Sequence, residues 1–174
     1  MKFSKRGDGG ETSLLGGQRV LKCDARPDTY GTLDEAGSVL GVARAMTGSG
    51  KIKGIILDVQ KDLLILGAEL SAMPDDCDKL GKVISQEDIR RLEEIIEELQ
   101  KNIPWKNEFV YPGQSVVSAQ IDVGRTVIRR AERKAAVLKR DGFIIRAEIR
   151  QYLNRLADML FVLARYDEQK GKSR

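Results

Sequence analysis

Histidine is absent from this 174-residue sequence, and only two cysteines occur, Cys23 and Cys77. The missing histidine excludes a His-based catalytic triad, a histidine metal site and a histidine acid–base catalyst within this chain. The two cysteines are far apart and form no CxxC pair, so neither a disulfide framework nor a thiolate metal site is expected. They read as ordinary thiols in a reducing compartment. Whatever this protein does, it therefore uses carboxylates, guanidinium groups, lysines and backbone amides.

Long apolar runs are missing as well. No stretch approaches the roughly 18 apolar residues of a membrane span. Residues 1–8 lack the apolar stretch of a cleaved signal peptide, so neither a membrane nor secretion is expected, and the cytoplasm is the predicted location. The 30 basic and 26 acidic residues leave a net charge of only +4. That balance is a weak indication for nucleic acid, which is not an expected partner.

The glycines are concentrated at the start of the chain. Five glycines lie between Gly7 and Gly17, a density that disfavours helix and predicts a loop or a pair of short extended pieces. The length suits one domain, 1–174, with a core that needs no disulfide or structural metal. Within it we expect an N-terminal arm over 1–24, a helical bundle over 25–166 and a frayed tail over 167–174.

Hydrophobic residues recur in alternating steps of four and three through most of the remainder, which is the spacing of helices packed in a bundle. The first helix should begin at Pro27 and end near Met46, before a glycine pair. Further helices are expected over 52–70 (closed by Pro74), 85–103, 114–141 and 149–163. Ser85 and Asp88 have the spacing of a capping box at the third of these. The fold class is therefore all-α, a five-helix bundle with a glycine-rich arm.

The fourth helix carries the clearest chemical pattern. Arg125, Arg129 and Glu132 are spaced four and three apart and share one face. Two fixed guanidinium groups are suited to binding phosphate oxygens, and a glutamate can orient one of them. The alternative is a solvated helix face with ordinary salt bridges.

The arm and two isolated polar residues are weaker candidates. Consecutive amides between Lys5 and Ser13 could form an anion-binding nest, although a flexible arm explains the same composition. Asp34 follows Leu33 at the edge of an apolar stripe, where a carboxylate usually needs a basic partner. Asn154 is a poor helix former inside an apolar helix, which suggests a hydrogen-bonding role.

Taken together and in order, these segments form a specific pattern: Gly7-Asp8-x-Gly10-x-Thr12-Ser13-Leu14, Tyr30-Gly31-Thr32-Leu33-Asp34-Glu35, Phe109-x-x-Pro112-Gly113, Arg125-Thr126-x-x-Arg129-Arg130-Ala131-Glu132-Arg133 and Tyr152-Leu153-Asn154-Arg155-Leu156-x-Asp158. Over residues 3–166 the sequence resembles the PduO-type ATP:cob(I)alamin adenosyltransferases.

The resemblance implies a ferritin-like, cobalamin adenosyltransferase-like bundle that acts as a homotrimer, with active sites between subunits. It implies transfer of the 5′-deoxyadenosyl group of ATP to the Co(I) centre of a corrinoid, which yields adenosylcobalamin and triphosphate, with Mg²⁺ accompanying the ATP. The cobalt of cobalamin is itself the nucleophile, which agrees with a protein that offers no histidine. A corrinoid reductase and an adenosylcobalamin-dependent enzyme are the implied partners.

The resemblance also assigns roles to individual residues. ATP binding falls to Ser4, Lys5, Gly7, Asp8, Gly10, Thr12, Ser13, Lys22, Arg129, Glu132 and Asn154. Corrinoid binding falls to Asp34, Phe109, Tyr111 and Arg125, and the catalytic set is Asp34, Phe109, Arg125 and Arg129. In this assignment Arg125 and Asp34 pair across the subunit boundary, and Phe109 excludes the lower ligand of cobalt so that the metal is four-coordinate.

Three positions depart from the family pattern: Arg6 replaces a threonine, Gly37 an asparagine and Asp122 a histidine. Asp122 lies one turn from Arg125 and could compete with Asp34 for it. These departures leave open an alternative, a corrinoid- or ATP-binding delivery or sensor protein of the same fold with weak or no turnover. A basic helical module that binds nucleic acid is a third hypothesis, which leaves the glycine-rich arm and Asn154 unexplained.

Overall fold

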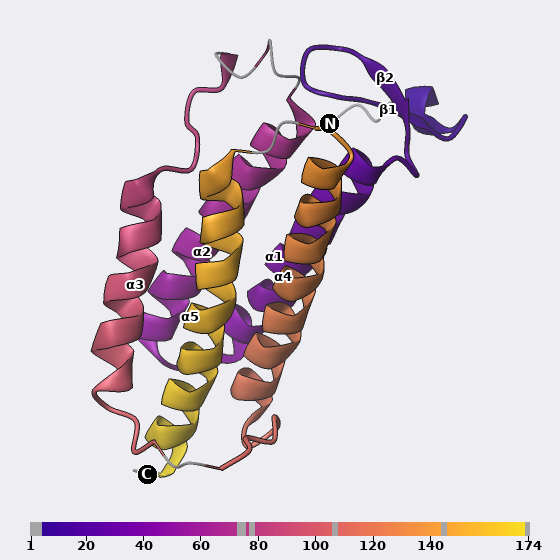
Figure 1. Ribbon diagram of the computed structural model, residues 1–174. Helices are drawn as coiled ribbons and strands as arrows, with labels where there is room; N and C mark the ends of the chain where they lie inside the picture. Colours follow the sequence, from indigo (N-terminus) through magenta and orange to yellow (C-terminus); the bar gives the residue numbers. More distant parts are fainter. Residues whose placement is uncertain (1–4, 73–75, 77–78, 106–107, 144–145, 173–174) are drawn as a thin grey trace.

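The computed structural model describes residues 5–72, 76, 79–105, 108–143 and 146–172. Within these residues, five α-helices form an elongated bundle (Figure 1). They are α1 (Ala25–Met46), α2 (Gly50–Ser71), α3 (Gln86–Gln100), α4 (Val116–Arg140) and α5 (Ala147–Lys172). Helix α1 packs against α2 and α4, and α5 packs against α4 and α3. The all-α five-helix prediction is confirmed.

The apolar seams supply the core. Leu40 of α1, Ile56 of α2, Leu92 of α3, Ile128 of α4 and Leu156 of α5 are all almost completely buried. Gly124 of α4 packs tightly against α1, because a Cβ atom at this position would lie 2.6 Å from Leu40 Cδ2. Among the described residues, none of the helices combines the length and apolar character that crossing a bilayer requires.

Serine side chains cap three of the helices. Ser85 and Asp88 form the predicted capping box at α3, with Ser85 Oγ accepting from the Asp88 amide at 3.3 Å and Asp88 Oδ2 accepting from the Ser85 amide at 2.9 Å. Ser115 and Ser118 form a second capping box at α4. Ser49 Oγ accepts from the Ile52 amide at α2.

The C-terminal segment differs from the prediction. Helix α5 continues through Asp167 to Lys172, so helical structure is not lost at residue 167 as the sequence suggested. Two contacts explain the extension: Asp167 Oδ2 accepts from Ser115 Oγ at 2.6 Å, and Glu168 pairs with Arg165 at 3.0 Å. Pro74 and Cys77 lie outside the described residues, and Cys23 is an exposed free thiol.

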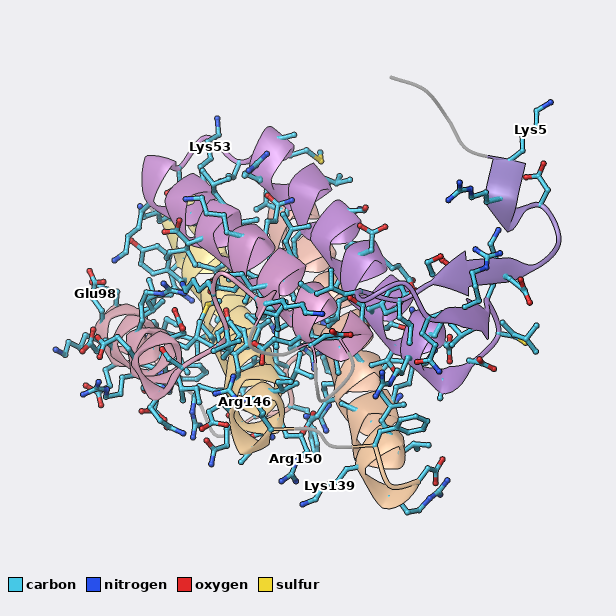
Figure 2. The ribbon with its side chains drawn as sticks, turned by 90° about the horizontal axis from the view of Figure 1, so that it is seen from above. Lys5, Lys53, Glu98, Lys139, Arg146 and Arg150 are labelled. Carbon is cyan, nitrogen blue, oxygen red and sulfur yellow. The ribbon has the colours of Figure 1, made fainter. Side chains whose placement is uncertain are left out.

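The glycine-rich arm forms a short 3₁₀ turn, η1 (Lys5–Gly7), and a two-stranded antiparallel hairpin, β1 (Glu11–Ser13) and β2 (Arg19–Leu21). The extended pieces expected from the sequence are therefore present. Seen from above, the arm projects to one side of the bundle, with Lys5 near its outer end (Figure 2).

Buried polar groups connect α2, α3 and α5. The Tyr152 hydroxyl donates to Asp62 Oδ2 at 2.6 Å, and Arg91 binds the same oxygen. Burial raises the pKa of Asp62 above its ordinary value. Burial, with the neighbouring Asp62 charge, holds the Tyr152 pKa well above its usual value. The motif tyrosine of α5 is thus a structural hydrogen-bond donor that joins two helices.

Candidate active site

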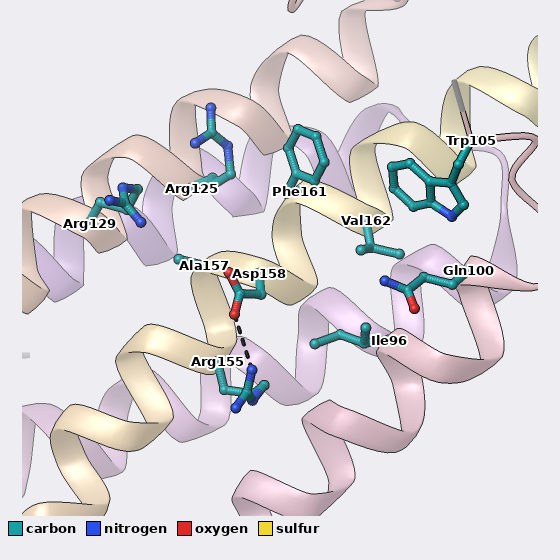
Figure 3. Close-up of a pocket in the computed structure, with 10 residues that line it drawn as sticks. All are labelled: Ile96, Gln100, Trp105, Arg125, Arg129, Arg155, Ala157, Asp158, Phe161 and Val162. Atoms are coloured by element: carbon teal, nitrogen blue, oxygen red, sulfur yellow. Dashed lines mark hydrogen bonds and ion pairs between the residues drawn. The ribbon is translucent and has the colours of Figure 1, made fainter. Parts of the chain in front are cut away.

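A groove of about 620 Å³ runs between α3, α4 and α5 (Figure 3). Its apolar side is formed by Ile96, Ala157, Phe161 and Val162, and its polar side by Gln100, Arg125, Arg129, Arg155 and Asp158, with Trp105 at one end. Arg155 is already paired, with Glu93 at 3.0 Å and Asp158 at 3.2 Å. Arg129 is exposed and has no ion-pair partner among the described residues. A guanidinium in that state can bind an incoming anion.

The predicted cluster on α4 is present. Arg125 and Arg129 both line the groove, and Asn154 Nδ2 donates to Glu132 Oε1 at 3.2 Å across the α4–α5 interface. Helices α4 and α5 pack side by side, which explains why two motifs 22 positions apart in sequence meet here. The Arg129, Glu132 and Asn154 set predicted to hold the nucleotide therefore comes from two adjoining helices.

Arg125 has a partner that the resemblance did not assign to it. Its Nε donates to Asp122 Oδ1 at 2.9 Å, one turn back on α4. Asp34 lies elsewhere, in a separate hollow of about 440 Å³ between α1 and α2 that Gly37 also lines. One chain therefore does not bring Asp34 and Arg125 together, and their predicted pair would have to join two subunits.

The arm brings Lys22 to the glycine-rich turn. A Cβ atom at Gly7 would lie 3.1 Å from Lys22 Nζ, so the ammonium rests against a residue with no side chain. The Lys22 amide donates to Gly10 O at 2.8 Å, and Gly10 adopts a φ of 84°, which favours glycine. The amides of Asp8 and Gly10, two donors of the expected anion nest, instead donate to carbonyls of the turn itself.

Thr12 and Ser13 form the first strand of the hairpin, where Thr12 faces Val20 and Ser13 Oγ accepts from Arg19 Nη1 at 3.3 Å. Arg19 also donates to the Arg6 carbonyl at 2.9 Å, which ties the second strand to the turn. The predicted ATP-binding residues of the arm thus belong to one small folded unit, namely Lys5, Gly7, Asp8, Gly10, Thr12, Ser13 and Lys22. Ser4, the remaining predicted contact of the arm, lies outside the described residues.

The arm is anchored to the bundle by contacts that the sequence did not reveal. Leu14 is buried, and the Leu15 amide donates to Ser71 O, at the end of α2, at 3.0 Å. Arg26, buried in the first turn of α1, donates to Ala72 O at 3.2 Å and places its guanidinium 4.8 Å from the centre of the Phe143 ring. Because these contacts join distant segments, no local pattern could have revealed them.

Phe109 and Tyr111 point away from the protein. Their exposed fractions are 93% and 78%, and neither lines the groove. Trp105, at the start of the same connection, stacks on Phe161 of α5 with ring centres 6.2 Å apart. The connection is thus fixed to the groove by Trp105 while it presents two uncovered aromatic rings, which are available to an apolar ligand or to another subunit.

A helical bundle whose groove combines apolar side chains with the unpaired guanidinium of Arg129, together with a basic arm, is suited to bind an anionic ligand that also has an apolar part. Comparison with known proteins gives the family. A family model described as cobalamin adenosyltransferase matches residues 2–167, and the chain belongs to that family.

Two curated relatives are similar over most of their own length. A corrinoid adenosyltransferase of Citrobacter freundii is 40% identical over 166 residues, which cover 95% of this chain and 94% of that protein. A corrinoid adenosyltransferase of Mycobacterium leprae is 38% identical over 169 residues, covering 94% and 88%. A variant of the PduO-type ATP:corrinoid adenosyltransferase from Lactobacillus reuteri, solved in complex with cobalamin and ATP, superposes with a TM-score of 0.90 at 29% identity and covers 98% of this chain and 94% of that one.

Proposed function

We propose that this protein transfers the 5′-deoxyadenosyl group of ATP to the Co(I) centre of a corrinoid, giving the adenosylated corrinoid and triphosphate. The structural observation that carries the proposal is the α4 face: Arg125 and Arg129 line one groove, and Glu132 meets Asn154 beside it. Membership of the cobalamin adenosyltransferase family supports it.

The residues suit a reaction in which the substrates supply the reacting atoms. The cobalt of the corrinoid is the nucleophile and the 5′ carbon of ATP is the electrophile, so the protein needs to position them and to stabilise charge. The leaving group is a polyanion, and the exposed guanidinium of Arg129 and the ammonium groups of Lys5 and Lys22 are the cations that would stabilise it.

Mg²⁺ would enter with the nucleotide. Magnesium in nucleotide sites is usually held by phosphates, waters and one or two carboxylates. Asp8 of the arm and Glu132 of α4 are the carboxylates that stand among the proposed nucleotide contacts. No group of three His, Cys, Asp or Glu side chains that could hold a metal ion occurs among the described residues, so we do not propose a dedicated protein site.

The active site is proposed to lie between subunits of a homotrimer. The arm projects to one side of its own bundle (Figure 2), whereas Arg129 lies in the groove of α4 and α5 (Figure 3). An arm that reaches the α4 face of a neighbour would unite the two halves of the ATP site, and the same contact would let Asp34 meet Arg125. Phe109 and Tyr111, which are exposed in the single chain, would then pack against a bound corrinoid.

An anaerobic assay tests the reaction. Chemically reduced cob(I)alamin, ATP, Mg²⁺ and protein are mixed, and loss of the Co(I) absorbance band is followed together with triphosphate release. Decay that requires both ATP and protein is expected. Binding of both ligands with a rate equal to the no-protein control would instead support a delivery or sensor protein. A reductase that supplies Co(I), a consumer of the product and the cytoplasmic location stay predictions.

A further inference from the structure

Asp122 lies behind the groove and contacts two arginines. Its side chain is 4% exposed. One carboxylate oxygen accepts from Arg125 Nε at 2.9 Å, and the other accepts from Arg165 of α5. Both guanidinium groups also lie over the Phe161 ring, with their central carbons 5.9 Å and 5.3 Å from its centre. The carboxylate therefore joins α4 to α5 directly beneath the groove.

The charges of this cluster balance. Arg165 is 5% exposed and also pairs with Glu168 at 3.0 Å, so two guanidinium groups face two carboxylates. A buried charge without such partners would be strongly destabilising. Arg165 and Glu168 complete the set from α5, so Asp122 is held by Arg165 as well as by Arg125.

Asp122 binds only one edge of the Arg125 guanidinium. Asp122 takes the Nε edge, and within the described part of the chain the two Nη groups have no hydrogen-bond partner. The side chain is 22% exposed and lines the groove. A guanidinium fixed by one edge presents its remaining donors in a rigid fork that fits a carboxylate or another planar acceptor.

We propose that Asp122 is a positioning residue: it orients Arg125 so that its Nη groups are available to a carboxylate from a neighbouring subunit or to the corrinoid. The proposal rests on the proposed function, in which Arg125 contributes to corrinoid binding and turnover. It also changes the expected relation between Asp122 and Asp34. The two carboxylates use different edges of one guanidinium and therefore share Arg125 instead of competing for it.

A double-mutant cycle tests whether Asp122 acts through Arg125. Asp122→Asn keeps the shape of the side chain but removes its charge and turns an amide donor toward one of the two arginines. We expect this variant to lower kcat/KM for the corrinoid by roughly ten- to a hundredfold, the size expected for losing a hydrogen bond to a charged group. The KM for ATP should change little. In an Arg125→Ala background the same substitution should have an effect of less than about threefold.

Glu69→Gln is the matched control. Glu69 is also a buried carboxylate bound by an arginine, Arg146 at 2.9 Å, and it accepts from the Ile84 amide at 2.6 Å, away from the groove. Glu69→Gln removes a buried charge and should therefore lower the melting temperature. It should not change kcat/KM in either the wild-type or the Arg125→Ala background. Equal effects of Asp122→Asn with and without Arg125 would overturn the proposal, since a merely structural role is additive.

A second readout separates failure of this inference from failure of the proposed function. Trp105 is the only tryptophan of the chain and lines the groove, so quenching of its fluorescence by cob(II)alamin reports corrinoid binding without turnover. If the wild type binds cobalamin without turnover, the proposed function fails. The double-mutant cycle can then be measured with the Kd for cobalamin, and it still tests the role of Asp122. If the wild type neither binds nor reacts, both fail. Should Asp122→Asn not fold, Arg165→Lys takes its place in the cycle, because it removes the Nη2 donor to Asp122 while keeping the charge.

Discussion

Arg129 differs from the other arginines of the groove because it is exposed and unpaired among the described residues, whereas Arg125 and Arg155 hold carboxylates of their own chain. We expect Arg129→Ala to raise the KM for ATP and to lower kcat, together by roughly ten- to a hundredfold in kcat/KM. Steady-state kinetics with ATP varied measure the loss, and circular dichroism should show unchanged helicity. Arg133→Ala, an exposed arginine one turn along α4, is the control; equal kinetics for the two variants would remove Arg129 from the site.

For Phe109, in contrast to Arg129, we expect an effect on the corrinoid and none on ATP. A ring that is 93% exposed also contributes little to stability. Phe109→Ala should leave the melting temperature and the KM for ATP unchanged, and should slow reduction and adenosylation of Co(II) corrinoid. Val110→Ala, a neighbouring exposed residue of the same connection, should leave all of these properties as in the wild type. An unchanged rate with Co(II) substrate for Phe109→Ala would contradict its assigned role.

At the scale of the helix, Gly124 sets how closely α1 and α4 approach. A methyl group there would lie 2.6 Å from Leu40 Cδ2 and 3.0 Å from its Cγ, and Leu40 is completely buried. We expect Gly124→Ala to destabilise the protein by about 1–2 kcal/mol, because overpacking outweighs the better helix propensity of alanine. Chemical denaturation measures the change.

Gly54→Ala is the matched substitution, since Gly54 is also helical and a Cβ there meets nothing within 4 Å. It should stabilise the protein by about 0.5–1 kcal/mol. Adding Leu40→Val to Gly124→Ala should recover part of the lost stability by making room for the methyl group. A stabilising Gly124→Ala would show that the two helices can move apart at low cost.

The helices also show how much of the fold could be predicted from the sequence. The steps of four and three placed all five helices, because an apolar face must be buried and its period identifies a helix. The capping box at Ser85 was readable because both of its members lie within four residues. The extension of α5 beyond Asp167 was not readable, since it depends on Ser115, 52 positions away.

Some residues of the candidate site could be found from a local sequence pattern, and others depend on contacts between distant segments. Arg125, Arg129 and Glu132 were found because one helix face is a local property, and Asn154 because an asparagine is unusual within an apolar helix. Arg165 was missed because its partner Asp122 lies 43 positions away, and charged residues near the end of a chain are common. The stacking of Trp105 on Phe161 follows from tertiary packing, and no local pattern around Trp105 predicts it.

For the whole molecule, the prediction concerns subunit number. Light scattering after gel filtration should give a mass three times the 19.4 kDa of the chain. A monomer with full activity would contradict a site shared between subunits.

Complementation tests the shared site directly. Lys22→Ala impairs the arm and Arg129→Ala impairs the groove, so each variant alone should have strongly reduced activity. Coexpression in equal amounts should restore activity at roughly a quarter of the sites, namely those built from the intact arm of one subunit and the intact groove of the next. Absence of recovery in a mixed trimer would place both residues in a site formed within one subunit.

The attachment of the arm to α2 has a consequence for sequence variation. Leu15 contacts Ser71 through main-chain atoms, an amide nitrogen and a carbonyl oxygen 3.0 Å apart, with a parallel bridge to Ala72 beside them. Selection acts on such a bond only through the backbone, so most side chains at positions 15 and 71 preserve it. Proline at position 15 is the exception, because it has no amide hydrogen to donate. Apart from proline at position 15, the side chains at the two ends of this attachment can therefore vary while the arm keeps its place on the bundle.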